Sequence, residues 1–539
     1  MAQPTGESKS LMQRFLDVVE KVGNKVPHPV IIFLILIGIV IVASHGLHLA
    51  GVSFTHEVVT TETKPDAPGY VYDTGTGADY AIQTVAETKS KIEPRVTAVR
   101  SLLTRDGIRF LYSSLIPNFM SFTAVGLMIV AMIGAGVAEE SGLVNALIRK
   151  LVLVSPSWAL SYLMAFAGIL ASIAADAGYL VLIPLAGTAF IAVGRHPIAG
   201  LALGFAAVAG AFTVNMLIKP LDAVLVEFTN DAIHLVDPGK SIGLAANLWF
   251  SIASVAILAV LITWITERVI EPRLGKYTPE HGSEAMEGGA LSAEESRGLT
   301  WATVGLIGVL VAFGFLTIPS GAPLRNPETD ALIGDSPFMN GMIGAIMAVF
   351  LVTGVAYGFG AGTMKSLTDV VKAIEKSVSS LGGTIFLFFI LSQFVAYFTY
   401  TNIGTILALK LSGLLQTAGF PPLLLLLGFI VVVALIDLLI TGAIAKWAIF
   451  APIFVPLLMK LGVDPAATLA AYRIADSPIN AITPLNAYFA LVVGFAQKYD
   501  KSAGVGTIVS LMLPYVVWLF VVWTALFTIW QVLGLPWGI

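Results

Sequence analysis

Two stretches of this chain share an outline: Leu182-Ile-Pro-Leu-Ala-Gly-Thr-Ala-Phe-Ile-Ala-Val-Gly-Arg-His-Pro197 and Phe450-Ala-Pro-Ile-Phe-Val-Pro-Leu-Leu-Met-Lys-Leu-Gly-Val-Asp-Pro465. A constant offset of 268 residues superimposes their Gly and Pro positions: Pro184 on Pro452, Gly194 on Gly462 and Pro197 on Pro465. After a small gap, Asn215-Met-Leu-Ile-Lys-Pro220-Leu221 corresponds to Asn480-Ala-Ile-Thr-Pro484-Leu485. Repetition at a fixed offset indicates two copies of one structural unit. Each copy is predicted to contain a Gly and Pro turn, followed by a helix that is interrupted between an Asn and a Pro.

The apolar run before each turn is about twice as long as one membrane-spanning helix. A hydrocarbon core of about 30 Å needs roughly 20 apolar residues per helix, but the two runs cover residues 157–192 and 421–459 without a charged loop. Short polar or small-residue segments interrupt the runs at 172–178 and 437–442. This pattern predicts two re-entrant hairpins. Hydropathy alone allows two ordinary crossings in each run equally well.

The composition is that of a membrane protein. Hydrophobic residues make up 57% of the 539 residues and charged residues 12%, against about 25% charged residues in ordinary soluble domains. Nine further segments fit a full crossing, near residues 28–50, 114–138, 198–232, 244–267, 300–318, 338–358, 382–400, 466–498 and 508–534. Five of them lie between the hairpins, and this odd number turns the second copy upside down. The predicted fold class is an all-α polytopic membrane protein with nine transmembrane helices, two re-entrant hairpins and an inverted repeat with discontinuous helices.

The predicted organisation follows from these segments and from the positive-inside rule, which places the N-terminus in the cytoplasm. It comprises a cytoplasmic N-terminal segment (1–27), a first helix (28–50), a periplasmic loop (51–112), a first repeat (113–270), a cytoplasmic loop (271–298), two linking helices (299–381) and a second repeat (382–539). Alternating and turn-rich stretches at 58–63 and 69–75 predict a small β-containing cap in the periplasmic loop.

The residue content argues against an enzyme, a metalloprotein and a nucleic-acid-binding protein. The chain has no cysteine, and its seven histidines fall mostly near segment ends or in loops, so no buried zinc or haem centre is expected. The net charge of −4 is small and does not suggest a basic face for nucleic acid. The stretch Gly358-Phe-Gly-Ala-Gly-Thr-Met-Lys-Ser366 lacks the adjacent Gly-Lys of a phosphate loop. We therefore expect no cofactor other than a coupling ion.

Polar side chains gather at the hairpins and helix breaks, where charged groups are costly and usually functional or paired. The first copy offers Asp176 at its hairpin tip, with Asn215, Lys219 and Asp222 at its break. A backbone interruption at membrane depth is tolerated where it lines a cavity or is buried in protein. We therefore expect both breaks to border the transport site, with Asp176 and Asn215 as candidate substrate-binding residues.

The second copy offers a candidate cation site. Arg473, Asp476 and Asn480 are spaced i, i+3 and i+7 and share one helical face, and Asp437 lies at the hairpin tip. Carboxylate, amide and freed carbonyl oxygens suit a hard cation such as Na⁺. The sequence predicts that Asp437, Asp476 and Asn480 bind this cation. The structural alternative is an ion pair between Arg473 and Asp476 that stabilises packing.

Two further residues of the second copy are candidates for substrate recognition. Trp447, at the hairpin tip, could stack on an aromatic solute, and Arg473 could hold a carboxylate or sulfonyl oxygen in forked geometry. Together they favour an aromatic substrate that is anionic or polar. Simple packing of Trp447 is the alternative, because tryptophan in membrane proteins is commonly an interfacial anchor.

Several motifs resemble those of the p-aminobenzoyl-glutamate transporter (AbgT) family. They are Ala445-Lys-Trp-Ala-Ile-Phe-Ala-Pro-Ile-Phe-Val-Pro456, Ala471-Tyr-Arg-Ile-Ala-Asp-Ser477, Ile482-Thr-Pro-Leu485, Asp176-Ala-Gly-Tyr-Leu-Val-Leu-Ile-Pro184, Gly194-Arg-His-Pro-Ile-Ala-Gly200 and Gln393-Phe-Val-Ala-Tyr-Phe398. The resemblance covers most of the chain from about residue 110. It implies a homodimer in the bacterial inner membrane, surrounded by lipid, in which each multi-pass protomer transports.

The resemblance also implies a substrate class and residue roles. Members handle p-aminobenzoyl-glutamate or export sulfonamide-like antimetabolites, coupled to a Na⁺ or proton gradient. By position, the residues that match family transport residues are Asp176, Trp447, Arg473 and Asp476, and Asn480 matches a cation-site residue. Two positions depart from the family pattern, with Asp437 in place of an asparagine and Ile444 in place of a serine.

The leading hypothesis is an ion-coupled exporter of aminobenzoyl compounds. An importer of p-aminobenzoyl-glutamate and a Na⁺-coupled carboxylate transporter of other specificity are alternatives, because the sequence does not set the direction. A channel is a rival from another class and would show flux without saturation. An intramembrane enzyme is a weaker option, because the sequence shows no paired catalytic motif.

Overall fold

The structure is a computed structural model, and it describes residues 29–63, 69–72, 79–82, 88–154, 156–173, 178–277, 291–333, 336–417, 419–438, 442–483, 485–486 and 488–539. The predicted N-terminal segment (1–27) lies outside these residues, as does Asp176. The predicted cytoplasmic loop (271–298) is described except for 278–290.

Long apolar helices dominate the described part of the chain. Seven helices are long and apolar enough to cross a membrane: α2 (Pro29–Leu49), the run of α11 (Leu248–Ile265), η2 (Thr266–Ile270) and α12 (Glu271–Leu274), α13 (Ala293–Thr317), α15 (Met342–Ala361), α17 (Gly382–Tyr400), α20 (Ala443–Lys460) and α23 (Val505–Val532). An eighth span results if α5 (Ala124–Glu140) is joined to α6 (Leu143–Val154), which bends from it by 60°. A polytopic, mainly helical membrane protein is therefore confirmed, and the count of nine crossings stays a prediction.

The first copy of the repeat consists of shorter helices. The predicted hairpin run holds α7 (Leu160–Ala171), then η1 (Gly178–Leu182) and α8 (Ile183–Ala192). The predicted interrupted helix holds α9 (Pro197–Gly210) and α10 (Pro220–His234), and Asn215 lies in the break as expected. Proline suits the first turn of a helix because it lacks the N–H that would have no partner there. Asp222 completes this start, since its Oδ2 accepts the Lys219 backbone N–H at 2.9 Å.

The second copy has the same order of elements. The second hairpin run holds α19 (Pro422–Asp437) and α20, and the interrupted helix holds α21 (Pro465–Asp476), the 3-10 turn η3 (Pro478–Ala481) and α22 (Phe489–Gln497). Both matched turn glycines have positive φ, 73° at Gly194 and 80° at Gly462. Glycine adopts this left-handed conformation without the steric cost of a Cβ atom. The matched glycines therefore end α8 and α20 in the same way.

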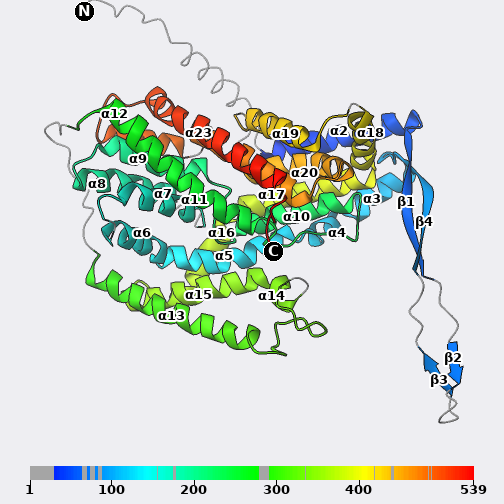
Figure 1. The fold of residues 1–539 in the computed structure, drawn as a ribbon, viewed down its shortest axis with the longest axis horizontal. Helices are drawn as coiled ribbons and strands as arrows, with labels where there is room; N and C mark the ends of the chain where they lie inside the picture. The colour runs from blue at the N-terminus through cyan, green and yellow to red at the C-terminus, as the bar shows by residue number, and fades with distance from the viewer. Residues whose placement is uncertain are drawn as a thin grey trace, which may run out of the picture.

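The two copies pack against each other at their breaks. Helix α10 packs on α20, and α9 packs on η3 and α23. Every residue of α9 and of α21 is buried, so these two short helices form the centre of the core. Figure 1 shows α13 and α15 along one edge of the molecule, on the side away from α23. Most residues of the two breaks are thus buried in protein, as the cost of free backbone groups requires, and Leu217 in the first break is the exposed exception among those described.

Several shorter helices correct the predicted boundaries. The predicted crossing at 114–138 is divided into α4 (Leu115–Met120) and α5. Helices lie in segments predicted as loops or linkers: α3 (Arg105–Ser113), α6, α16 (Leu367–Ser380) and α18 (Ile403–Thr417). The short helix α14 (Pro337–Asn340) stands at the start of the crossing predicted at 338–358. Hydropathy does not find α16, because its polar residues outnumber its apolar ones. A capping box of Ser366 and Asp369 begins it, and this pattern is a sequence signal for a helix start.

The predicted β-containing cap is confirmed. Strand β1 (Ser53–Thr63) pairs antiparallel with β4 (Thr88–Ala98), and β2 (Gly69–Tyr72) pairs antiparallel with β3 (Asp79–Ile82). The register of the first pair sets Ser53 opposite Ala98 and Thr63 opposite Thr88. Figure 1 shows β1 and β4 projecting from the end of the molecule opposite α12.

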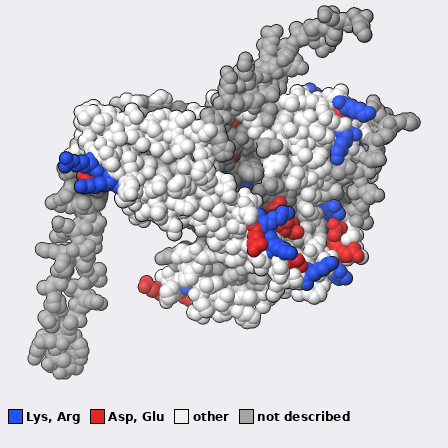
Figure 2. Space-filling view, turned by 180° about the vertical axis from the view of Figure 1, so that it is seen from behind, with Lys and Arg blue, Asp and Glu red and all other residues white. Residues whose placement is uncertain are grey.

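Charged side chains are unevenly distributed over the face in Figure 2. They form a group at the far left and several groups to the right of the centre, and the broad band between these is almost free of Lys, Arg, Asp and Glu. Two ion pairs illustrate the charged end near α6, Arg149 with Glu295 at 2.9 Å and Lys376 with Glu140 at 2.7 Å. An uncharged band between charged ends is the surface that a protein crossing a hydrocarbon core requires.

Candidate functional site

Six charged side chains lie buried where the two copies meet. They come from the start of α10, from the two sides of the tip of the predicted second hairpin and from α21, and no residue among them exceeds 8% exposure: Lys219, Asp222, Asp437, Lys446, Arg473 and Asp476. Three are acidic and three are basic. Because buried charge is costly unless it is paired, the pairing of these six groups determines what the site can bind.

Lys446 lies between the two carboxylates predicted to bind a cation. Its Nζ contacts Asp437 Oδ1 and lies 2.6 Å from Asp476 Oδ1, and all three side chains are fully buried. The structure therefore brings Asp437 and Asp476 together as predicted, but an ammonium group of the chain itself already bridges them. Among the described residues, the second oxygen, Oδ2, of each carboxylate has no hydrogen-bond partner.

Asn480 does not point its amide nitrogen at these carboxylates. Its Nδ2 donates to the backbone carbonyl of Asp476 at 2.7 Å, and the backbone carbonyl of Asn480 accepts from Asn486 Nδ2 at 2.9 Å. The amide thus stabilises the end of α21, where the helix leaves carbonyls without intrahelical partners. The structure places Asn480 one helical turn from Asp476. Its role as a cation ligand stays a prediction.

Arg473 is paired across the interface between the two copies. Its Nη1 lies 2.6 Å from Asp222 Oδ1 and also donates to the Thr213 carbonyl at 2.6 Å, and its Nε donates to Asn247 Oδ1 at 3.3 Å. The alternative of an ion pair between Arg473 and Asp476 is therefore wrong. Although the two residues share a helix face, Arg473 reaches the first break while Asp476 faces the second hairpin.

Asn215 joins the first break to the first hairpin. Its Nδ2 donates to the carbonyls of Ile169 and Leu170 at 3.2 and 3.1 Å and to Ser172 Oγ at 3.1 Å, while its Oδ1 accepts the Leu217 N–H at 3.0 Å. Both side-chain polar atoms of Asn215, Nδ2 and Oδ1, thus have hydrogen-bond partners within the protein. The side chain therefore satisfies the carbonyls at the end of α7, and a role in substrate binding stays a prediction.

Trp447 is completely buried and its indole N–H is satisfied. The Nε1 atom donates to the Leu225 carbonyl at 3.0 Å and lies 3.1 Å from Thr229 Oγ1, both on α10. Its ring lies against Tyr472 with centroids 4.5 Å apart, and Tyr472 in turn donates to Asp476 Oδ1 at 3.1 Å. In this conformation Trp447 is part of the packing between α10, α20 and α21, and it adjoins the carboxylate cluster through Tyr472.

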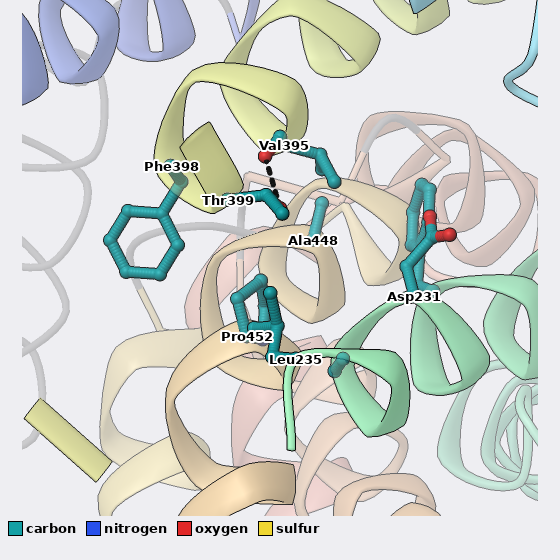
Figure 3. Close-up of a pocket in the computed structure, with 9 residues that line it drawn as sticks. Asp231, Leu235, Val395, Phe398, Thr399, Ala448 and Pro452 are labelled. Carbon is teal, nitrogen blue, oxygen red and sulfur yellow. Dashed lines mark hydrogen bonds between the residues drawn. The ribbon is translucent and has the colours of Figure 1, made fainter. Parts of the chain in front are cut away.

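One cavity borders the first break and another lies beside the second half of α10, and the six buried charges line neither of them. A cavity of about 660 Å³, mostly apolar, is bounded by α5, α6, α13, α15 and the segment 216–218 of the first break. A cavity of about 10 Å³ lies between α10, α17 and α20 (Figure 3), with Asp231 and Thr399 among its lining residues. The small cavity has room for one water molecule at most. The large one has the size of a solute cavity.

Sequence reasoning missed the groups that position Arg473. Asn247 binds both the guanidinium and, through Nδ2, the Ala466 carbonyl at 2.9 Å, so it links α11 to the start of α21. Thr213 offers its carbonyl to Arg473 and donates its N–H to Ser477 Oγ at 3.1 Å. Asn247 and Thr213 are isolated polar residues in apolar runs. Such a pattern indicates a candidate residue, but it does not predict which residue the side chain contacts.

Comparison with known proteins agrees with this architecture. The model of the AbgT transporter family matches residues 14–539. The p-aminobenzoyl-glutamate transport protein of Escherichia coli (strain K12) is 30% identical over 538 residues, which cover 100% of this chain and 98% of that protein. The chain belongs to the AbgT family. The resemblance found in the sequence motifs is thereby confirmed, and the AbgT chain is a membrane transporter rather than a soluble protein.

Two solved transporter structures are similar to this AbgT chain. The YdaH transporter of Alcanivorax borkumensis is 37% identical, with a TM-score of 0.83 over 95% of this chain and 100% of that chain. MtrF of Neisseria gonorrhoeae, described as illuminating a class of antimetabolite efflux pumps, is 36% identical, with a TM-score of 0.83 over 96% of this chain and 97% of that chain. The AbgT chain therefore shares the fold of both transporters.

Proposed function

We propose that this AbgT-family protein is an ion-coupled secondary transporter that exports p-aminobenzoyl-glutamate and related aminobenzoyl or sulfonamide antimetabolites. The observation that carries the proposal is the meeting of six buried charges at helix breaks contributed by both copies of the repeat. Inverted repeats with broken helices at a central site are a common transporter architecture. The names of the relatives, one a p-aminobenzoyl-glutamate transport protein and one an antimetabolite efflux pump, support the substrate class.

The proposed coupling site is the cluster of Asp437, Lys446 and Asp476. Two carboxylates and one ammonium leave one net negative charge in a fully buried position. Their partnerless Oδ2 atoms offer two ligands for Na⁺ or one site for a proton. Binding of either cation would neutralise the cluster, which is favourable where the dielectric constant is low. Asn480, next to Asp476 on the same helix end, is the proposed third ligand for Na⁺.

The proposed solute site adjoins the coupling site through α21. Arg473 and Asp476 are separated by one helical turn, so a movement that changes the environment of one side chain reaches the other. In the proposed transport cycle, Arg473 exchanges Asp222 for an anionic group of the solute, and Trp447 provides a ring for stacking. Asp176 and Asn215 are proposed to complete this site from the first copy.

The remaining features of the proposal concern the assembly and its location. We infer a homodimer in the bacterial inner membrane, with nine crossings, two hairpins and the second copy inverted relative to the first. The uncharged band in Figure 2 supports contact with lipid on that face. No catalytic residue is proposed, so two aqueous compartments are needed to observe the activity.

Transport in liposomes tests the proposal. Purified protein would be reconstituted, and labelled p-aminobenzoyl-glutamate and a labelled sulfonamide would be followed under separate Na⁺ and proton gradients of both directions. We expect saturable movement that depends on one of the two gradients and runs opposite to the cation. Failure of both solutes to move would refute the substrate class, movement along with the cation would identify an importer, and non-saturable flux would identify a channel.

A further inference from the structure

The first break contains a buried ammonium group without a carboxylate partner among the described residues. Lys219 is 1% exposed, and its Nζ donates to the Phe212 carbonyl and to Ser172 Oγ, the latter at 3.2 Å. Asp222 is the nearest acidic residue along the chain, but both of its carboxylate oxygens have other partners. Its Oδ1 binds Arg473 at 2.6 Å, and its Oδ2 accepts the backbone N–H of Lys219 at 2.9 Å rather than the ammonium. The charge of Lys219 is therefore held by neutral acceptors.

Lys219 and Arg473 are directed at the same short piece of backbone. The Phe212 carbonyl accepts from Lys219 Nζ, and the next carbonyl along the chain, that of Thr213, accepts from Arg473 Nη1 at 2.6 Å. These residues lie between the end of α9 and the start of α10. Two cationic groups, one from each copy of the repeat, thus converge on adjacent peptide groups.

The charges of the site are divided between two clusters of opposite sign. Lys219, Asp222 and Arg473 together carry one net positive charge, whereas Asp437, Lys446 and Asp476 carry one net negative charge. A surplus buried charge is retained at a cost, and in membrane proteins such a residue is usually functional. Taken alone, the positive cluster has a surplus charge that a bound anion would neutralise, as a bound cation would neutralise the negative cluster.

We propose that Lys219 and Arg473 form a two-cation site that binds the paired carboxylates of a dicarboxylate solute, and that Lys219 selects dianions over monoanions. On solute binding, carboxylate oxygens replace the Phe212 carbonyl as the acceptor of Lys219 and Asp222 Oδ1 as the acceptor of Arg473, while Asp222 Oδ2 keeps its hydrogen bond to the Lys219 backbone N–H at the start of α10. This inference rests on the proposed function for the identity of the solute, since the glutamyl end of p-aminobenzoyl-glutamate carries two carboxylates. Lys219 would be the specificity-determining residue for the second one.

Binding to purified full-length protein in detergent tests the inference with two matched solutes. p-Aminobenzoyl-glutamate has two carboxylates, and p-aminohippurate has the same aminobenzoyl amide with one. Because a hydrogen bond to a charged group is worth about 1.5–3 kcal/mol, we expect Lys219→Gln to weaken binding of p-aminobenzoyl-glutamate by roughly tenfold or more. Binding of p-aminohippurate should change less than about threefold, and Lys219→Arg should restore the preference for the dianion. Lys365→Gln, at an exposed lysine, is the control and should bind as wild type.

An equal loss for both solutes in Lys219→Gln would indicate a general structural role and would overturn the inference. Wild-type affinity of this variant for both solutes would overturn it as well. Lys219 could instead serve only to neutralise the charge of Asp176, and the double variant Lys219→Gln/Asp176→Asn tests this. Recovery of wild-type affinity and dianion preference in this double variant would also overturn the inference.

A wrong substrate class in the proposed function can be distinguished from a wrong two-cation site. If the wild-type protein binds neither aminobenzoyl solute, thermal stabilisation by glutarate and by butyrate decides the question without the aromatic group. The two-cation site predicts that glutarate stabilises the wild type more than butyrate, and that Lys219→Gln removes the difference. Absence of a dicarboxylate preference in the wild type would overturn the inference on its own.

Discussion

Five of the six buried charges at the centre of this protein take an ionic partner from another element, and this pairing sets what the residues can do. Lys446 bridges Asp437 and Asp476, and Arg473 binds Asp222 across the two copies of the repeat. The family resemblance implies an asparagine where this chain has Asp437. The additional carboxylate is accommodated because the Lys446 ammonium lies against it.

The bridge predicts how substitutions of Lys446 affect stability. Lys446→Met leaves two adjacent buried carboxylates without their cation, and removing one partner of a buried ion pair typically costs about 3–5 kcal/mol. We expect a clear loss of thermal stability in detergent, with a larger stabilisation by Na⁺ than in the wild type. Lys446→Met/Asp437→Asn removes one of the two charges and should regain most of the lost stability.

The matched variants separate ion binding from packing. Asp437→Asn and Asp476→Asn should each weaken stabilisation by Na⁺, because each removes a charged ligand. Thermal unfolding with Na⁺ and with choline as the replacement cation measures both effects. If Na⁺ raises the unfolding temperature of all these variants as much as that of the wild type, the cluster does not bind Na⁺. If Lys446→Met/Asp437→Asn is no more stable than Lys446→Met, the bridge is not the source of the lost stability.

The helices show how one pattern of elements is used twice. In each copy the predicted hairpin run is followed by a glycine with positive φ, a proline that starts a short helix, and a break. His196 and Asp464 occupy the same position before the two prolines, and each accepts a backbone N–H as a helix cap. The short helices α9 and α21 are buried on all sides, so the repeat brings its polar breaks into the core. Element order was predictable because Gly, Pro and Asn act through local backbone preferences.

The turn glycines provide a test at this scale. Gly194→Ala and Gly462→Ala place a Cβ atom in left-handed backbone, which costs roughly 1–2 kcal/mol. Since an added Cβ meets no atom within 4 Å at either position, the loss of thermal stability should come from the backbone alone. Gly308→Ala is the matched control, because Gly308 lies inside α13 with equal space and alanine is favoured there by up to about 1 kcal/mol. Equal stability of Gly194→Ala, Gly462→Ala and the control would contradict the assignment.

The whole molecule connects two sites of opposite charge through one short helix. The negative cluster at the end of α21 and the positive cluster around Arg473 are one turn apart, and both are enclosed by elements of the two copies. Binding at one cluster therefore changes the electrostatic and mechanical environment of the other. If the two clusters bind the cation and the solute as proposed, this coupling is reciprocal, and each ligand changes the affinity of the other by the same factor.

This reciprocity predicts the direction of transport from binding data. An exporter driven by an inward cation gradient exchanges the two ligands, so the coupling cation should weaken solute binding, by roughly fivefold or more for typical coupling energies. An importer carries both together, and the cation should then strengthen solute binding. The Kd of p-aminobenzoyl-glutamate would be measured with and without Na⁺ and across pH, using Asp476→Asn as the variant in which the dependence is lost. A Kd that responds neither to Na⁺ nor to pH would contradict coupling through this cluster.

The sequence alone determined the repeat, the two hairpin runs, the breaks at Asn215 and Asn480, the β-containing cap and the family. It did so because hydropathy, Gly and Pro preferences and motif spacing are properties of short segments. The tertiary structure decided which buried charges meet. A helix face shows that Arg473 and Asp476 are neighbours, but the partner of Arg473 lies 251 residues away at Asp222, and Lys446 fills the position predicted for a free cation. These pairings depend on how α10, α20 and α21 pack together, and no local preference encodes that packing.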